Sequence, residues 1–181
     1  MKASSSGRTR TVSGAKTEGV FEAMHEAASL LGRAYIVKRP TSWKPIRPTG
    51  GGMLCVPEKP SGVDYTGVLS DGRALFIEAK RHTGGPFPLT RIEPQQVWEM
   101  RRVYDVSATA RRALAIEWFP TAKRDLEQVE LPEGASVICV LPWKKVEEAL
   151  GAGEKTLSPS TLTVALVRRN VDDYLRALME C

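Results

Sequence analysis

The chain has 181 residues, of which 42% are hydrophobic and 26% are charged, and it carries a formal net charge of +5. This length suits one compact domain with a real core, and the positive charge favours a polyanionic partner. Three widely spaced cysteines without a CxxC pair, together with only two histidines, argue against a zinc site or a disulfide framework. The N-terminus is polar and no apolar run approaches the ~18–20 residues of a membrane helix, so we expect a cytoplasmic protein without a membrane partner.

The first 16 residues predict a flexible basic arm. They are rich in Ser, Gly, Thr and Arg, show no apolar period, and precede the first acid at Glu18. Arg8, Arg10 and Lys16 in this arm are candidate contacts to a DNA phosphate backbone. A solvated tail is the alternative. Residues 17–181 are expected to form a single domain.

Apolar periodicity in the rest of the chain predicts alternating helices and strands. A helix is expected over Thr17–Leu31, where apolar side chains recur at i, i+3 and i+4, and Gly32 ends it. Val63–Leu69 and Ala74–Ala79 predict a hairpin, because Asp71-Gly72 between them is a favourable turn pair. The order of elements indicates a mixed α/β sheet with helices on its faces. The remaining elements are strands over Ala34–Lys38, Ala113–Phe119 and Ser136–Leu141, helices over Glu93–Val106, Trp143–Leu150 and Val171–Met179, a loop over His82–Pro88, and a strand or extended segment over Leu162–Val167.

The segment Arg39–Pro60 does not fit this alternation. It contains five prolines and the run Gly50-Gly51-Gly52, and it is too long and irregular for an ordinary connection. Such a segment in a compact domain is usually functional or disordered. Its apolar side chains indicate that part of it is packed; they are Trp43, Ile46, Met53 and Leu54.

Asp64, Glu78 and Lys80 carry the strongest chemical signal. Asp64 ends a loop, and Glu78 and Lys80 flank an alanine in an apolar run. Side chains in a strand alternate between faces, so Glu78 and Lys80 point the same way. Two carboxylates and a phosphate suffice to hold Mg²⁺, which prefers hard oxygen ligands, while a lysine orients water and offsets developing negative charge. The three residues therefore predict a metal-dependent nuclease.

An acid followed by Glu-x-Lys on a strand is the PD-(D/E)xK nuclease pattern, but the pattern by itself also fits a solvated ion pair on an edge strand. Phe76 and Ile77 before the motif indicate a buried strand, in which a charged pair is costly unless it is used. On the motif alone, both interpretations stay open.

A longer segment resembles the RecU family of Holliday junction resolvases: SGVDYTGVLSDGRALFIEAKRHTGGPFPLTRIEPQQVWEM. The family carries a similar Asp-Tyr-x-Gly-Val hairpin, a strand like Phe-Glu-Ala-Lys, a Phe-Pro-Leu loop and a helix with His-Gln. Upstream, YIVKRPTSW is similar to the family's strand followed by Lys-Lys-Pro-Thr, and the spacing of Gly14 and Glu18 fits its first helix. The resemblance spans roughly residues 14–150 and joins several unrelated short motifs in order.

The resemblance implies roles for individual residues. Asp64 and Glu78 match the family's metal-binding acids, and Lys80 matches its catalytic lysine. Glu18 matches a first-helix glutamate that completes the metal site from across the fold. Glu22, one helical turn later, is the rival for this position, with a surface charge as its alternative role.

Gln96 matches the family's helix glutamine beside the catalytic site, and a solvated helix amide is the alternative. Two positions depart from the family's pattern. Val63 stands where the family has threonine before the aspartate, and Gln95 replaces its histidine before the glutamine. A hydroxyl near the metal is therefore missing unless Ser61 or Thr66 substitutes. Neither change removes a metal ligand, so activity is expected, with room for a different metal preference.

The resemblance also implies a restriction-endonuclease-like α/β fold, with a mixed central sheet flanked by helices. Family members have a protruding stalk before the catalytic hairpin, which enters the centre of the junction. Residues 39–62 occupy that place in a shorter, glycine-richer form. Trp43 there is either a base-stacking residue at the crossover or a packing anchor. The candidate phosphate contacts are Arg39, Lys44 and Arg47 in this stalk-like loop, and Arg81 beside the catalytic lysine.

The implied function is a homodimeric, Mg²⁺-dependent endonuclease, with Mn²⁺ as a substitute, that resolves four-way DNA junctions by paired nicks and leaves a 5′-phosphate and a 3′-hydroxyl. A two-fold dimer matches the approximate symmetry of the junction, and selectivity comes from junction shape and backbone charge. Two alternatives stay open. One is another PD-(D/E)xK repair or restriction-type endonuclease that cuts ordinary duplex, and the other is a non-catalytic junction-binding module.

Overall fold

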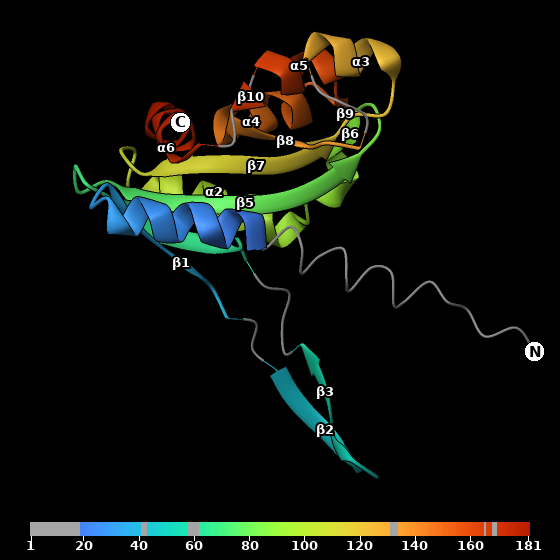
Figure 1. Cartoon of the computed structure of the whole chain (residues 1–181). Coiled ribbons are helices and arrows are strands. Elements are labelled where there is room, and N and C mark those ends of the chain that lie inside the picture. Colours follow the sequence, from blue (N-terminus) through green and yellow to red (C-terminus); the bar gives the residue numbers. More distant parts are fainter. Residues whose placement is uncertain (1–18, 41–42, 58–61, 131–133, 165, 168–169) are drawn as a thin grey trace, which may run out of the picture.

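A six-stranded mixed sheet forms the centre of the protein (Figure 1). The computed structural model describes residues 19–40, 43–57, 62–130, 134–164, 166–167 and 170–181. Neighbouring strands are antiparallel except for one central parallel pair, β5 with β7. In spatial order the strands are β1 (Ala34–Lys38), β4 (Tyr65–Leu69), β5 (Ala74–Thr83), β7 (Arg111–Phe119), β8 (Val137–Pro142) and β10 (Leu166–Val167).

Helices cover both faces of this sheet, which gives the predicted restriction-endonuclease-like α/β architecture. The first helix, residues 19–30, and α6 (Val171–Glu180) pack on one face through Phe21, Ala28 and Leu175. The opposite face is covered by α2 (Pro94–Val106), α4 (Trp143–Gly151) and α5 (Pro159–Val164). Shorter elements are β6 (Phe87–Pro88), η1 (Leu89–Arg91), α3 (Lys123–Gln128) and β9 (Thr156–Leu157).

Strand β5 runs through the middle of the sheet and serves both hydrophobic cores. Leu75 and Ile77 point into the core beneath the first helix, whereas Phe76 packs on the opposite side with α2. This is the alternation expected of a central strand. Because Glu78 and Lys80 follow Phe76 in the same register, the alternation places them on the α2 face of the sheet.

Two glycines are required by the backbone of the β4–β5 hairpin. Gly72 in the turn has φ of +84°, in the left-handed region that L side chains rarely adopt, which agrees with the predicted Asp-Gly turn. Gly67 pairs with Ile36 of β1, and a Cβ atom at this position would collide with the carbonyl oxygen of Tyr35. The glycine of the Asp-Tyr-x-Gly-Val motif is therefore required for the close packing of β4 against β1.

The stalk-like loop contains a two-stranded antiparallel hairpin, β2 (Trp43–Thr49) with β3 (Gly52–Pro57), which protrudes from the body in Figure 1. These two strands form a separate sheet and do not join the central one. The expectation that its apolar residues are packed is wrong for three of them, since Ile46, Met53 and Leu54 are 56%, 54% and 41% exposed. A two-stranded ribbon has no second layer against which to bury them.

The base of the hairpin is tied to helix α2. The Arg39 guanidinium forms an ion pair with Glu99, and the other carboxylate oxygen of Glu99 accepts a hydrogen bond from the Val63 amide at 2.8 Å. The Arg39 amide donates to the Asp64 carbonyl at 2.8 Å. These contacts join the segments on either side of the hairpin at the residue that precedes β4.

Two segments differ from their predicted structure, and two short elements were not predicted. Residues Leu162–Val167 divide between the end of α5 and strand β10 instead of forming one strand. The predicted loop His82–Pro88 is shorter, because β5 continues to Thr83 and β6 pairs with β9. Helix α3 and strand β9 have no apolar period long enough to predict them. The predicted basic arm, residues 1–16, lies outside the described residues, and no helix in the described ranges is long and apolar enough to cross a bilayer.

Candidate functional site

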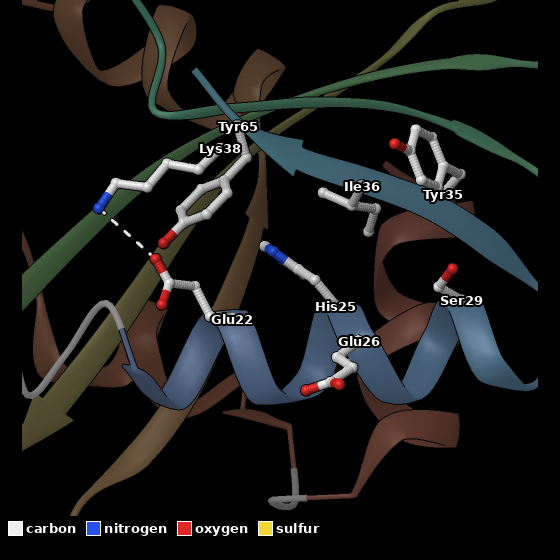
Figure 2. A pocket seen from close by; sticks show the side chains of 8 residues that line it. All are labelled: Glu22, His25, Glu26, Ser29, Tyr35, Ile36, Lys38 and Tyr65. Atoms are coloured by element: carbon white, nitrogen blue, oxygen red, sulfur yellow. Dashed lines mark ion pairs between the residues drawn. The ribbon is translucent and has the colours of Figure 1, made fainter. Parts of the chain in front are cut away.

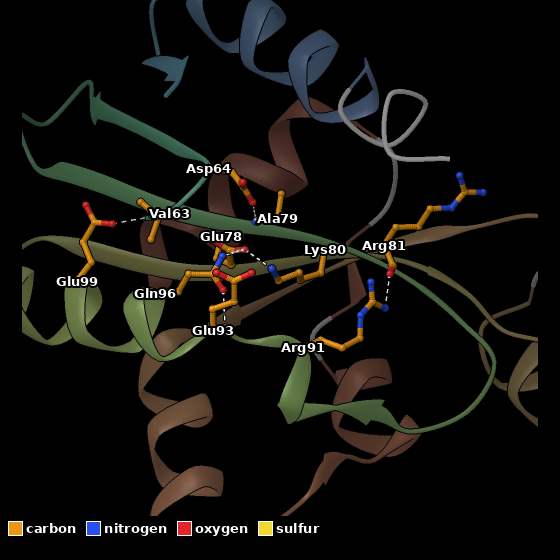
Figure 3. Close-up of polar contacts among 10 residues, drawn as sticks. All are labelled: Val63, Asp64, Glu78, Ala79, Lys80, Arg81, Arg91, Glu93, Gln96 and Glu99. Atoms are coloured by element: carbon orange, nitrogen blue, oxygen red, sulfur yellow. Dashed lines mark hydrogen bonds and ion pairs between the residues drawn. The ribbon is translucent and has the colours of Figure 1, made fainter. Parts of the chain in front are cut away.

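Asp64, Glu78 and Lys80 come together on the sheet (Figure 3). Asp64 precedes β4, and its Oδ2 accepts a hydrogen bond from the Ala79 amide of β5 at 2.9 Å. The Nζ of Lys80 lies 2.5 Å from Oε1 of Glu78. This hydrogen bond fixes Asp64 beside the middle residue of the Glu-x-Lys motif. The β4–β5 hairpin brings the two residues together.

Gln96 holds Glu78 from the opposite side. Its Nε2 donates a 2.6 Å hydrogen bond to Oε1 of Glu78, and its own Oε1 accepts from the Glu93 amide at 2.9 Å. Gln96 sits in the first turn of α2, where Glu93 is the N-cap residue, so this second hydrogen bond also caps the helix. At 4% exposure, Gln96 is not the solvated amide that was the alternative.

The surroundings of Glu78 disfavour the negative charge of its carboxylate. Glu78 is fully buried, and its Oε2 has no hydrogen-bond partner among the described residues. Burial, and then the neighbouring charge of Asp64, raise the pKa of Glu78 to about 8, whereas Lys80 acts in the opposite direction. Unpartnered buried carboxylate oxygens are costly. A divalent cation between Glu78 and Asp64 would remove this cost.

The donor set suits a hard divalent metal. Mg²⁺ is bound through carboxylate oxygens and keeps several of its waters, so it needs few protein ligands. Within the described ranges, no group of three or more acidic, histidine or cysteine side chains gathers as a metal site. The predicted third ligand, Glu18, lies outside those ranges, so Asp64 and Glu78 are the two predicted ligands that the structure describes.

Glu22, the rival of Glu18, lies on the first-helix side of the sheet. It pairs with Lys38 at 3.5 Å and lines an open hollow of about 250 Å³ with His25 and Tyr65 (Figure 2). Burial lowers the pKa of His25 to about 4, and its Nε2 lies 2.9 Å from the Tyr174 hydroxyl, so this histidine is a neutral core residue near pH 7. The contacts of Glu22 are therefore with β1.

The predicted DNA contacts are spread over several surfaces. Lys44 and Arg47 are exposed on the hairpin, whereas Arg39 is engaged with Glu99 at its base. Arg81 follows Lys80 by one residue, and strand alternation places its side chain on the other face of β5, with its guanidinium 4.3 Å from the centroid of the Phe119 ring. Three further predicted contacts, Arg8, Arg10 and Lys16, lie outside the described residues.

Two residues beside the site were not predicted. Glu99 joins Arg39 to the Val63 amide, and Arg91 donates to a backbone carbonyl just beyond Lys80. Both are charged side chains in segments of mixed polarity, and their partners become neighbours only in the folded sheet. The one signal in the sequence was the position of Glu99, about one turn after Gln96 on the same helix.

Comparison with protein families decides the assignment of the chain. A model of recombination protein U, RecU, matches residues 13–116, which is more than half of the 181-residue chain. The chain belongs to the RecU family. RecU proteins are Holliday junction resolvases of recombination, so membership implies a role at Holliday junction DNA. The match contains Asp64, Glu78, Lys80 and Gln96. None of the curated proteins compared with the chain matches it significantly.

The buried side-chain amide of Gln96 in this RecU member allows a test of its contact with Glu78. Gln96→Leu keeps the size of the side chain and removes both of its hydrogen bonds, so Glu78 loses a donor. We expect junction nicking to fall by about 10–100-fold, as when outer partners of metal ligands are removed. Initial nicking rates over a Mg²⁺ titration measure the loss. Gln95→Leu, at the exposed neighbouring position, is the matched control, and equal rates for both variants would contradict the assigned role.

Proposed function

We propose that this RecU-family protein is a metal-dependent endonuclease that resolves Holliday junctions by paired nicks, with its catalytic centre at Asp64, Glu78 and Lys80. One observation carries the proposal. A fully buried Glu78 has one oxygen held by Lys80 and Gln96, while its other oxygen is without a partner among the described residues and the charge of Asp64 is close by. Buried polar atoms usually have a hydrogen-bond partner, so the unpartnered oxygen supports a ligand at this position.

Asp64 and Glu78 would hold the metal, and Glu18 remains the predicted third ligand. When bound, Mg²⁺ supplies charge neutralisation at the phosphate and makes water more acidic. Mn²⁺, which takes the same oxygen ligands, is the expected substitute. These residues fit such an ion because both are carboxylates, and the buried Glu78 has one oxygen that no described residue partners.

Lys80 and Gln96 have separate tasks in the proposed reaction. Lys80 places its ammonium beside Glu78, where it orients the attacking water and offsets negative charge that develops on the phosphate. Gln96 fixes the orientation of Glu78 through a hydrogen bond that is itself anchored on the helix cap. Hydrolysis of the phosphodiester by in-line attack leaves a 5′-phosphate and a 3′-hydroxyl.

Paired nicking requires two such centres. A four-way junction has approximate two-fold symmetry, so a homodimer with two-fold symmetry presents one centre to each of two opposing strands. Selectivity would then come from the shape of the junction and from backbone charge, with little reading of base edges. A monomer at concentrations that support paired nicking would contradict this part of the proposal.

The β2–β3 hairpin is proposed to distinguish a junction from ordinary duplex. It protrudes from the body, and Lys44 and Arg47 are exposed on it (Figure 1). Replacing residues 43–57 by a short Gly-Ser linker is expected to leave the thermal midpoint nearly unchanged, because several of the side chains removed are already exposed. Preference for the junction over a linear duplex of the same sequence should be lost, as measured by competitive nicking.

The same assay separates the alternatives. With the hairpin intact, a duplex-cutting PD-(D/E)xK enzyme would nick the junction and the linear duplex equally. A non-catalytic module would bind the junction and nick neither substrate. A variant with Gly50-Gly51 changed to Asn-Gly, which alters only the hairpin turn, controls for disturbance of the chain. If the linker variant keeps the preference for the junction, the hairpin does not determine it.

A further inference from the structure

Arg91 is held rigidly at the edge of the candidate site. It ends η1, the turn that leads into α2, and its Nη1 donates to the Arg81 carbonyl at 2.6 Å. Its guanidinium carbon lies 5.6 Å from the centroid of the Phe87 ring, and Phe87 is fully buried. A backbone carbonyl and a fixed aromatic ring therefore restrict a side chain that would otherwise lose much entropy on binding a ligand.

The position of Arg91 relative to the catalytic lysine follows from the strand. Its acceptor, the Arg81 carbonyl, is one residue beyond Lys80 on β5. Figure 3 shows Arg91 reaching β5 from the segment that precedes α2, beside Lys80. The Arg81 side chain extends away from Lys80 in the same view. Arg91 thus extends the positive charge of Lys80 along the α2 face.

No carboxylate in the described part of the chain compensates the charge of Arg91. Among the described residues none forms an ion pair with it, and partial burial alone lowers the pKa of its guanidinium. Burial is the main cause of the lowered pKa of His82, and the charge of Arg91 lowers it further. A partly desolvated guanidinium with free donors is suited to a phosphate, which accepts two parallel hydrogen bonds from it.

We propose that Arg91 binds a non-scissile phosphate of the DNA strand that enters the Asp64–Glu78–Lys80 centre, next to the phosphate that is cut. This inference rests on the proposed nuclease function and names a positioning residue for it. Arg91 fixes the strand so that the scissile phosphate reaches Lys80. Arg81, the neighbouring arginine predicted from the sequence, stacks on Phe119 on the opposite face and does not contact this strand.

The two arginines form a matched pair for the test, because each guanidinium packs on an aromatic ring and only one is on the α2 face. Binding of a synthetic four-way junction is measured without divalent cations, over a range of salt, for wild type, Arg91→Gln, Arg91→Lys and Arg81→Gln. Each phosphate contact contributes about 0.9 to the salt slope. Arg91→Gln should lower the slope by about one phosphate contact per site and weaken binding severalfold. Arg91→Lys should keep the slope, since the charge remains.

A structural role would give a different result. Loss of the hydrogen bond to Arg81 could change the thermal midpoint, but it would not change the number of counterions released. Arg176→Gln on α6, an exposed arginine on the opposite face of the sheet, should match wild type in both measurements. The proposal is overturned if Arg91→Gln keeps the wild-type salt slope or if Arg81→Gln lowers the slope instead. It is also overturned if Arg91→Lys lowers the slope as much as Arg91→Gln.

Nicking locates the contact and separates this inference from the proposed function. Junctions with one neutral methylphosphonate, placed singly at each of the linkages flanking the nick, should show one position that slows wild type and leaves Arg91→Gln unaffected. Equal sensitivity of both proteins at every position contradicts the assigned contact. If wild type binds the junction but nicks nothing with Mg²⁺, the proposed function fails, whereas the salt slopes still decide whether Arg91 binds a phosphate.

Discussion

Asp64→Asn is expected to lower junction nicking by more than about 100-fold, beyond the loss that removing an outer partner of a metal ligand produces. The change removes one of the two described carboxylates, while the asparagine oxygen still accepts the hydrogen bond from the Ala79 amide. The fold and junction binding should therefore remain close to wild type. Nicking of an end-labelled junction and a mobility shift without divalent cations measure the two properties.

Asp71→Asn is the matched control, because it removes the same charge from the exposed β4–β5 turn, where Asp71 pairs with Arg73. It should nick at the wild-type rate. A protein that still cuts at full rate with Asp64→Asn would place the catalytic centre elsewhere. Equal losses of nicking rate in Asp64→Asn and Asp71→Asn would mean that the effect comes from the change in net charge.

The second large effect is a dependence of stability on pH that Glu78→Gln should remove. Burial, followed by the charge of Asp64, raises the pKa of Glu78 from 4.5 to about 8. The folded protein thus holds a proton that the unfolded chain releases between these values. The contribution of this bound proton to the free energy of unfolding is complete below pH 4.5 and is lost as pH rises through 8. In the absence of metal, the loss is on the order of a few kcal/mol.

Urea unfolding in EDTA at pH 6 and pH 8.5 tests this expectation. The free energy of unfolding of wild type should fall more between the two pH values than that of Glu78→Gln, with Glu127→Gln as an exposed control that behaves like wild type. Because Mg²⁺ competes with the proton on Glu78, it should stabilise wild type more at pH 8.5 than at pH 6. Parallel pH dependence in wild type and Glu78→Gln would contradict the raised pKa.

Long apolar repeats made much of the fold predictable. Strand β1 has the predicted bounds, and helix α2 begins one residue after its predicted start because Glu93 is its N-cap. Strand β5 is longer than predicted, since Lys80, Arg81 and His82 gave no apolar signal, although pairing with β7 continues through them. The hairpin escaped prediction because two prolines lie within β2, and its ladder has an irregularity between Pro45 and Arg47.

The part of the candidate site that lies on a single strand was predictable from the sequence. Alternation along one strand sufficed to pair Glu78 with Lys80, and the resemblance to RecU proteins added Gln96, whose role depends on a helix packed against that strand. Arg91 and the helix residue Glu99 could not be found in this way. Each contacts a backbone group, the Arg81 carbonyl or the Val63 amide, which carries no side-chain signature. The other partner of Glu99 is Arg39, which is 60 residues away in the sequence.

We propose that a divalent cation at Asp64 and Glu78 drives resolution of the junction. The most direct measurement is nicking of a synthetic four-way junction by the wild-type protein over a Mg²⁺ titration that starts from EDTA. We expect no product in EDTA, and with Mg²⁺ two nicks in opposing strands that carry 5′-phosphate and 3′-hydroxyl ends. Equal nicking in EDTA, or binding of the junction with no nicking by either Mg²⁺ or Mn²⁺, would contradict it.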